Sequence, residues 1–571
     1  NMGNALKDKG ELDAAIDSYK QAIKINPDSA KAHYNMGNAL KRKGELDGAI
    51  DSYTQALKIK PDYAAAYANL ADALQGIKFL RSNTDLIVVI LNLLDQKIHV
   101  RPISIARTII SLIKLDKNFK EVFSNYDTCI LQENLEEACK TLLNIPLLIR
   151  IMELCPIPDL EIENLLTYLR SKILINIFEL SKSQNTLTFQ SALALQCYNN
   201  EYIYFQTDEE IEIIATLDDS VSNNLMNARQ PSPLVLACLA SYKPLHEYSW
   251  CHLLKLPKEL LALEERQILE FNKETLIRSK IPIVNKIKDC VSSKVKEQYE
   301  ENPYPRWIDL KTDWKPMSVF QLAEGLDLKI KDVELCKVQS PQILIAGCGT
   351  GQHSIEAATR YKNCNVLAID LSLRSLAYAK RKTEELGINN IKYMQADILD
   401  LLKLGRQFDI IESAGVLHHM GNPMEGWKVL TDCLKLGGLM RIGLYSATAR
   451  ASIVKVRKEI AKAKKIDPLD MKIFRRKLIK SKHEHHKLIL LSPDFFNLSS
   501  LRDLLFHVQE HRFTLPQIEN YLSELALDFC GFESPTIVKK YKLQHQDPDD
   551  LFDLKKWDAF EKENPHTFSR M

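Results

Sequence analysis

A glycine-rich turn between two apolar runs is the part of this chain best suited to chemistry. The segment ILIAGCGTG contains Gly347, Gly349 and Gly351. A second apolar run, NVLAID, ends in Asp370. Glycines let the backbone approach a ligand closely, and an acid at the end of the next strand can accept hydrogen bonds from ribose hydroxyls. This strand–turn–helix–strand pattern predicts a site for a nucleoside-bearing cofactor.

Two histidines follow a later apolar run. FDIIESAGVLHHM contains Glu412, which we expect in the loop after the strand, together with His418 and His419. An unperturbed imidazole titrates near pH 6.5, so either histidine could act as a general base at neutral pH. The alternative is that both histidines only pack over the cofactor.

RDLLFHVQEHRF contains a second candidate set. If this segment forms a helix, His507 and His511, four positions apart, lie on one face, and Glu510, three positions after His507, lies beside His507. Such a helix over the site of the reacting substrate could contact that substrate or transfer a proton. The alternative is that these residues form a structural hydrogen-bond network. The three histidines of HEHHK, residues 483–487, cannot all face one ion on a helix, and no framework of acids or cysteines surrounds them, so we expect a surface histidine cluster and no metal site.

Alternating strands and helices position the glycine turn. From residue 341 onward, five apolar runs are separated by helical patterns, which predicts an α/β doubly wound (Rossmann-like) domain with a parallel sheet. The runs are QILIAG, CNVLAID, IKYMQAD, FDIIESAG and GLMRIGLY.

The first residues of the chain are repeated. NMGNALKDKGELDAAIDSYKQAIKINPD recurs 34 residues later with few changes, which is the period of tetratricopeptide repeats. Small residues at Gly37 and Ala49 allow close helix packing, Tyr53 fills the groove to the next unit, and Pro61 ends the second helix. A third unit loses the pattern, and the first lacks its opening residues, so we expect that the native N-terminus is missing.

We predict four regions, making the chain multidomain. They are a tetratricopeptide solenoid at 1–77, a helical middle domain at 78–270, a linker or lid with ENPYPRW at 271–340, and the α/β domain at 341–571 with a helical cap insertion at 446–530. The lid or substrate candidates are Tyr299, Tyr304, Arg306, Trp307 and Glu510. Packing as an interdomain linker is the alternative for ENPYPRW.

The GxGxG spacing resembles motif I of class I S-adenosylmethionine-dependent methyltransferases. Asp370 matches the family's ribose ligand, and Asp397, in YMQADILDL, matches the acid near the adenine amino group. The family often has an acid two residues before the first glycine, where this chain has Ile345. The resemblance implies S-adenosyl-L-methionine as cofactor, bound by Gly347, Cys348, Gly349, Thr350, Gly351, Asp370, Leu371, Asp397, Ile398 and Ala414. A flavin or nicotinamide site is the alternative.

The whole chain resembles bacterial proteins that fuse tetratricopeptide repeats, a helical middle domain and such a methyltransferase. The resemblance implies methyl transfer without naming a substrate. We expect a protein or peptide acceptor recruited by the repeats. The alternatives are a small-molecule acceptor, such as a sugar or lipid precursor, and a non-catalytic interaction scaffold.

Composition limits the partners. The 571 residues have a formal net charge of +2, which gives no overall attraction to nucleic acid or to a membrane. Twelve scattered cysteines favour a reducing, cytoplasmic environment. The cap segment from Ala451 to His483 is strongly basic. This charge is typical of a solvated helical face, and the alternative is a surface that attracts an acidic substrate or RNA.

Overall fold

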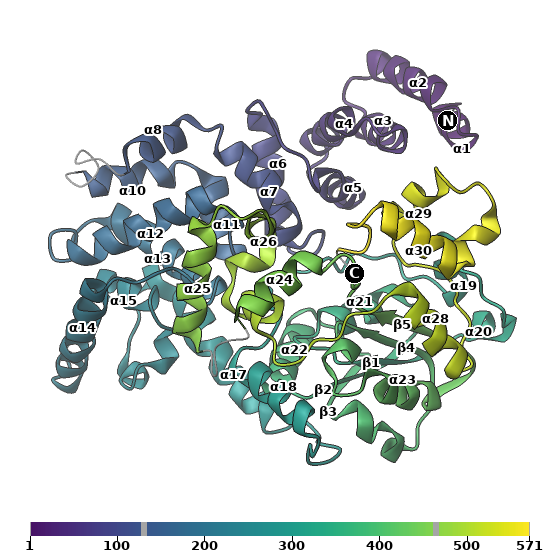
Figure 1. Cartoon of the computed structure of the whole chain (residues 1–571). Helices are drawn as coiled ribbons and strands as arrows, with labels where there is room; N and C mark the ends of the chain where they lie inside the picture. The colour runs from purple at the N-terminus through teal and green to yellow at the C-terminus, as the bar shows by residue number, and fades with distance from the viewer. Residues whose placement is uncertain (1, 127–133, 461–466, 570–571) are drawn as a thin grey trace. The chain divides into compact units, whose positions relative to one another are not determined.

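Paired antiparallel helices open the chain in the computed structural model, which describes residues 2–126, 134–460 and 467–569 (Figure 1). The repeat helices are α1 (Met2–Asp8), α2 (Leu12–Ile25), α3 (Ala30–Lys43), α4 (Leu46–Ile59) and α5 (Ala64–Leu74). A Cβ atom at Gly37 would lie 2.6 Å from Cε1 of Tyr53, so only glycine lets this tyrosine pack between α3 and α4. Gly3 and Tyr19 repeat the arrangement one unit earlier, also at 2.6 Å.

Contacts within the chain define two units. The first comprises Asn1–Glu270, Trp307–Asp313 and Phe496–Leu498, and the second comprises Phe271–Arg306, Trp314–Phe495 and Ser499–Met571. This division into two units does not test the boundaries of the four regions predicted from the sequence, so those boundaries stay a prediction.

Helices also make up the rest of the first unit, as the apolar periodicity indicates. Two of them begin at strong N-caps: Asp159 accepts from two backbone N–H groups, and Thr207 forms a capping box with Glu210. The helices are α6 (Thr84–Asp95), α7 (Pro102–Ile113), α8 (Lys117–Asn125), α10 (Leu135–Leu143), α11 (Pro146–Leu154), α12 (Leu160–Ile175), α13 (Gln184–Asn199), α14 (Asp208–Met226), α15 (Pro233–Ala240) and α16 (Leu261–Glu264), with short turns η1 (Leu245–Glu247), η2 (Cys251–Leu253), η3 (Lys258–Leu260) and η4 (Glu265–Leu269).

A five-stranded parallel sheet lies at the centre of the second unit (Figure 1). Its strands are β1 (Gln342–Ala346), β2 (Asn365–Asp370), β3 (Ile391–Gln395), β4 (Phe408–Ala414) and β5 (Leu434–Gly443), in the order β3-β2-β1-β4-β5. All five predicted strands are present. The order reverses between β1 and β4, and the crevice at the carboxyl ends of these strands is where doubly wound sheets bind ligands.

Helices cover both faces of this sheet, which explains why its strands are apolar throughout. Alternate strand residues such as Ile343 and Leu344 therefore enter two different cores. One core includes α21 (Gln352–Arg360) and α22 (Leu373–Glu385), and the other includes η5 (Ile398–Leu404) and α23 (Pro423–Asp432).

The remaining helices of the second unit flank the sheet domain or follow it. Among the described residues, no helix is long and apolar enough to cross a membrane. These elements are α17 (Glu270–Arg278), α18 (Cys290–Glu301), α19 (Val319–Gly325), α20 (Val333–Lys337), η6 (Leu417–His419), α24 (Ala451–Ile460), α25 (Pro468–Lys480), α26 (Glu484–Leu490), η7 (Pro493–Phe496), α27 (Leu498–Leu501), η8 (Arg502–Phe506), α28 (Leu515–Glu524), α29 (Pro535–Lys542), η9 (Pro548–Phe552) and α30 (Leu554–Glu563).

Candidate active site

The glycine turn connects β1 to α21 at the carboxyl edge of the sheet. Gly347 has φ +81°, and a Cβ atom there would lie 2.3 Å from Cγ2 of Val416. Gly349 has φ +52°, and a Cβ atom there would lie 2.7 Å from the carbonyl oxygen of Tyr304. Both positions combine a left-handed backbone with a close neighbour, so the turn requires glycine at each.

Asp370, at the end of β2, organises this turn. Its carboxylate accepts hydrogen bonds from the backbone N–H groups of Gly349, at 2.8 Å, and Ser372, at 2.9 Å. Burial raises the pKa of Asp370, and these backbone donors oppose that effect. The acid thus lies beside the glycine backbone, where a ribose would bind.

Asp397 follows β3 and caps η5. Its carboxylate accepts from the backbone N–H of Leu399 at 3.1 Å, and burial raises its pKa. Ile398 is buried in the apolar core behind it, whereas Ala414, at the end of β4, is exposed. Nothing lies within 4 Å of the Cβ position of Gly415. At this edge of the sheet the carboxyl end of β4 is therefore exposed, whereas Asp397 is buried and Asp370 is half-buried.

The other predicted cofactor-binding residues differ in burial and in the hydrogen bonds that their side chains and carbonyls already make. Cys348 is buried, and burial raises the pKa of its thiol. Thr350 is fully buried, and its hydroxyl donates to the carbonyl oxygen of Pro305. Leu371 is half-buried, and its carbonyl accepts from Gln395 at 2.7 Å. For Cys348 and Thr350, any contact to a cofactor would come from the backbone.

Helix α18 and the residues after it lie over this edge. Ser372 donates its hydroxyl to the carbonyl oxygen of Tyr299 at 3.1 Å, and the backbone N–H of Leu373 donates to Glu300 at 2.6 Å. Together with the close approach of Tyr304 to Gly349, these contacts place the start of ENPYPRW against the glycine turn. Arg306 ends this stretch, half-buried, whereas Trp307 is buried and belongs to the first unit. A lid role for the segment remains a prediction.

A cluster of ring side chains lies beyond β4 and β5. We call it the histidine–tyrosine cluster, and it comprises Tyr299, His418, His419, Tyr445, Asp503 and His507. Asp503 joins the two tyrosines, because it accepts from Tyr299 at 2.8 Å and from Tyr445 at 3.3 Å. His418 stacks on Tyr445 with ring centroids 3.7 Å apart, and His419 stacks on His507 at 3.6 Å.

Of the four candidate histidines, His418 differs from the other three in its hydrogen bonding. His419 places Nδ1 2.7 Å from the carbonyl oxygen of Gln509, whose backbone N–H in turn donates to Nδ1 of His507 at 3.2 Å. His511 places Nε2 2.9 Å from the side-chain nitrogen of Gln509. His418 is 1% exposed, and neither ring nitrogen has a hydrogen-bond partner among the described residues.

Burial sets the charge of this cluster. It lowers the pKa of His418 well below its usual value, lowers that of His419, and lowers that of His507 to about 2. Burial also raises the pKa of Tyr299 and Tyr445 well above 10. At neutral pH the three imidazoles and both phenols are therefore uncharged.

These shifts predict acid-sensitive stability. The folded pKa of each histidine lies below the unfolded value near 6.5, so the unfolded chain binds more protons as pH falls. The stabilisation is fully present above pH 6.5 and is lost progressively as pH falls from there toward the folded pKa. Between pH 7 and pH 6, we expect the free energy of unfolding to fall by up to about 2 kcal/mol. Urea unfolding at pH 8, 7, 6 and 5 measures this, and a flat profile from pH 8 to pH 6 would contradict it.

The prediction of one helix through His507 and His511 is wrong. The helix ends at Phe506, and the following residues run extended against the sheet domain. His511 donates its backbone N–H to His418 at 2.7 Å, and Phe513 donates to Tyr445 at 2.9 Å. These tertiary hydrogen bonds replace the helical ones, so the local pattern did not decide the structure.

Glu510 lies outside the histidine–tyrosine cluster. Its side chain is 1% exposed and pairs with Arg450 at 2.8 Å and with Arg457 at 3.7 Å. The predicted helical step between Glu510 and His507 is therefore absent. Glu510 instead anchors the extended segment to α24 and to the loop before it.

The cluster also brings together three groups able to bind a metal, but their geometry is unsuitable. Ligand atoms of His419, Asp503 and His507 lie within 4.8 Å of one another. The two imidazoles, however, are stacked with planes only 21° apart. Lone pairs lie in the ring planes, so the lone pairs of two nearly parallel rings do not point at one ion at a bond length of about 2 Å.

Glu412 belongs to a second buried network, which was not predicted from the sequence. Glu412 lies within β4 rather than in the following loop, and is 1% exposed. His353 lies 2.5 Å from its carboxylate, and Tyr361 and Arg441 donate at 2.9 and 3.2 Å. Burial alone would raise the pKa of Glu412, but these partners hold it well below its usual range. The available signal was an acid at Glu412, directly after the apolar pair Ile410 and Ile411 of the strand.

Comparisons with known proteins agree with this geometry. Residues 343–438 match a family model described as a methyltransferase domain, and residues 3–44 and 37–77 match one described as a TPR repeat. An uncharacterized protein of Synechococcus sp. is 29% identical over 201 residues, which is 34% of this chain and 48% of that protein. The (S)-coclaurine N-methyltransferase of Papaver somniferum is 29% identical over 115 residues, 20% of this chain and 32% of that enzyme.

Among solved structures, PKMT2 from Rickettsia typhi in complex with AdoHcy aligns with 46% of this chain and 53% of its own, at a TM-score of 0.33 and 17% identity. The chain covers less than half the length of each curated relative named above. The sheet order, the glycine turn and the family match nevertheless agree. The chain therefore joins tetratricopeptide repeats to a class I S-adenosylmethionine-dependent methyltransferase domain, whose cofactor is S-adenosyl-L-methionine.

Proposed function

We propose that this chain transfers a methyl group from S-adenosyl-L-methionine to a nucleophile on a protein or peptide acceptor. The observation that carries the proposal is the glycine turn at the carboxyl edge of the sheet, with Asp370 and Asp397 at the ends of adjacent strands. When bound, the cofactor supplies a methyl group on a positively charged sulfur, which a lone pair of the acceptor attacks in line.

The repeats support a macromolecular acceptor. Tetratricopeptide repeats present surfaces for other proteins, and a binding module in the same chain raises the effective concentration of a tethered substrate. The partner would therefore be a protein or peptide. A small-molecule acceptor is the second candidate, since the Papaver relative is named as an N-methyltransferase of coclaurine.

We propose that His418 takes the proton that the nucleophile loses. Its ring is neutral at pH 7, and both nitrogens are without a partner among the described residues, so a lone pair is available. A weak base suffices, because a nucleophile becomes more acidic as its bond to the methyl group forms. His419 and His507 each have a ring nitrogen bound to Gln509, so they position the loop around His418.

Isotopic labelling tests the proposal. The full chain is incubated in a cell lysate with an isotopically labelled methyl donor, and the products are sorted into protein, RNA and small molecules. We expect label in the protein fraction, and about 100-fold less with His418→Gln. Asp432→Ala, on the exposed surface of the same domain, is the control and should match the native chain. Label in the small-molecule fraction would favour the second candidate, and no label in any fraction would contradict methyl transfer.

A further inference from the structure

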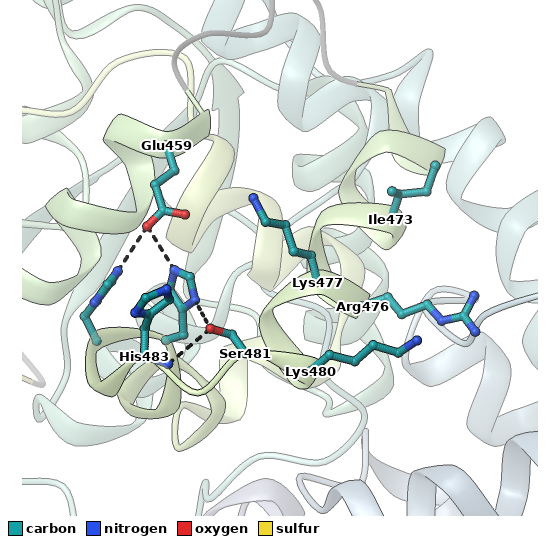
Figure 2. Close-up of a pocket in the computed structure, with 9 residues that line it drawn as sticks. Glu459, Ile473, Arg476, Lys477, Lys480, Ser481 and His483 are labelled. Carbon is teal, nitrogen blue, oxygen red and sulfur yellow. Dashed lines mark hydrogen bonds and ion pairs between the residues drawn. The ribbon is translucent and has the colours of Figure 1, made fainter.

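A separate set of metal-binding groups lies in the cap segment, outside the active site. Figure 2 shows a pocket where Glu459 meets neighbouring imidazoles. Oε1 of Glu459, from α24, lies 3.0 Å from Nε2 of His485 and 3.0 Å from Nε2 of His486, both from α26. Three potential ligand atoms from two helices therefore converge on one point.

The orientation of the two rings allows a shared ion. The planes of His485 and His486 are 62° apart, with centroids separated by 4.3 Å. In-plane lone pairs on rings at this angle can meet at one position. The stacked pair His419 and His507, at 21°, has no such meeting point. Both sets contain two histidines and one acid, but only the set with His485 and His486 has ring orientations suited to binding one metal ion.

The spacing of the ligand atoms also suits a small ion. Zinc binds nitrogen and carboxylate oxygen at about 2.0–2.2 Å in tetrahedral sites, so adjacent ligand atoms lie about 3.3–3.5 Å apart. The separations of 3.0 Å from Glu459 to each histidine need to open by only a few tenths of an ångström. Glu459 and His485 are partly exposed, at 34% and 26% of their side chains, so they can make this adjustment.

Neighbouring groups fix one ligand and leave one position open. His486 is buried, and its Nδ1 lies 2.7 Å from the hydroxyl of Ser481, which holds the ring in place. Arg476, Lys477 and Lys480 line the same pocket but are exposed, so water screens their repulsion of a cation. They also favour water or an anion as the fourth ligand.

Without a metal, the carboxylate takes the place of the ion. Glu459 then accepts N–H hydrogen bonds from both rings. These bonds lower the pKa of Glu459, and the bond from His485 has the larger effect. A metal must displace the two ring protons, so its binding is in competition with protonation. The sequence-based expectation of no metal rested on the residues adjacent to HEHHK, whereas Glu459 is separated from His485 by 26 positions.

We propose that Glu459, His485 and His486 bind one divalent transition-metal ion, and that zinc best matches this set of two imidazoles and one carboxylate. The ion would tie α24 to α26. Two residues before Glu459, Arg457 donates to the carbonyl oxygen of His507 at 2.8 Å. Metal binding would therefore stabilise the helix that supports one side of the histidine–tyrosine cluster.

Competition for zinc tests the assignment. The untagged full chain competes with a chromophoric chelator for Zn²⁺, and the native chain is compared with Glu459→Gln and His485→Ala. We expect one high-affinity site that each substitution weakens at least about 10-fold. Both side chains are partly exposed, so the variants should keep the fold, which circular dichroism verifies. His545→Ala is the matched control, because His545 is also partly exposed and pairs with a carboxylate, that of Asp550.

Cobalt gives an independent reading of the same site. Co²⁺ bound to the native chain should show the intense visible bands of a tetrahedral ion, and both variants should lose them. Unchanged zinc affinity in both variants would overturn the proposal. So would a loss of zinc in His419→Ala that His485→Ala does not share, because the ion would then lie in the histidine–tyrosine cluster.

Discussion

Asp370→Ala is expected to weaken binding of S-adenosyl-L-methionine by about 100-fold or more. The carboxylate would accept hydrogen bonds from the ribose, and hydrogen bonds to a charged group contribute about 1.5–3 kcal/mol each. The two bonds of a ribose diol thus correspond to about 10²–10⁴ in the dissociation constant. The substitution also removes the acceptor of the Gly349 N–H, at 2.8 Å, and so loosens the turn itself.

Calorimetric titration with the cofactor measures this effect. Asp370→Asn separates the two contributions, because it keeps an oxygen for the backbone donors but removes the charge, and an intermediate affinity is expected. Asp432→Ala, exposed at the end of α23, serves as the control and should bind like the native chain. A dissociation constant unchanged in Asp370→Ala would refute the placement of the ribose.

The glycine turn and the strands around it could be predicted because their causes are local. Apolar runs bounded by glycines and acids lead to buried parallel strands wherever helices can cover both faces. Gly347 and Asp370 keep their predicted places because the turn needs a positive φ and the strand must end in a polar group. The repeats are equally local, since Gly37 and Tyr53 pack within one helical pair.

The acceptor side was harder to predict because its contacts are distant in sequence. The helical period of RDLLFHVQEHRF was real, but hydrogen bonds from His511 to His418 and from Phe513 to Tyr445 draw the segment into an extended form. Likewise, the acid that meets the histidines of HEHHK is not its own Glu484 but Glu459, which only the packing of α24 on α26 brings to them. Local patterns cannot report a partner that tertiary structure supplies.

Buried polar networks show the same limit. Glu412 was expected in the loop after the strand but lies inside the strand, where a buried acid is costly unless it is paired. The compensating partners are His353, Tyr361 and Arg441, and the first and last of these lie 59 and 29 positions away from it. No spacing rule connects these residues, so the network becomes visible only when the sheet and α21 are assembled.

Glu412→Ala is expected to destabilise the methyltransferase domain by about 3–5 kcal/mol, the usual cost of removing one member of a buried ion pair. The hydroxyl of Tyr361, which is 7% exposed, loses its acceptor, and His353 loses its carboxylate. Calorimetric unfolding measures the change, and the relevant transition is the one that S-adenosyl-L-methionine shifts upward. Glu533→Ala is a matched control, because Glu533 pairs with the same Arg441 at 2.5 Å but is more exposed, so a loss below about 1 kcal/mol is expected.

The pH dependence of this difference tests its electrostatic cause. The pKa of Glu412 in the folded chain lies below its usual value of 4.5. Its stabilisation is therefore fully present above pH 4.5 and is lost as pH falls toward the folded pKa. The gap between the native chain and Glu412→Ala should therefore shrink as pH falls below 4.5. The titrations of His418, His419 and His507, which do not contact Glu412, affect both chains equally and cancel in the difference. A gap that stayed constant down to pH 3, or one no larger than that of Glu533→Ala, would show that packing rather than the buried charge network holds β4 against α21.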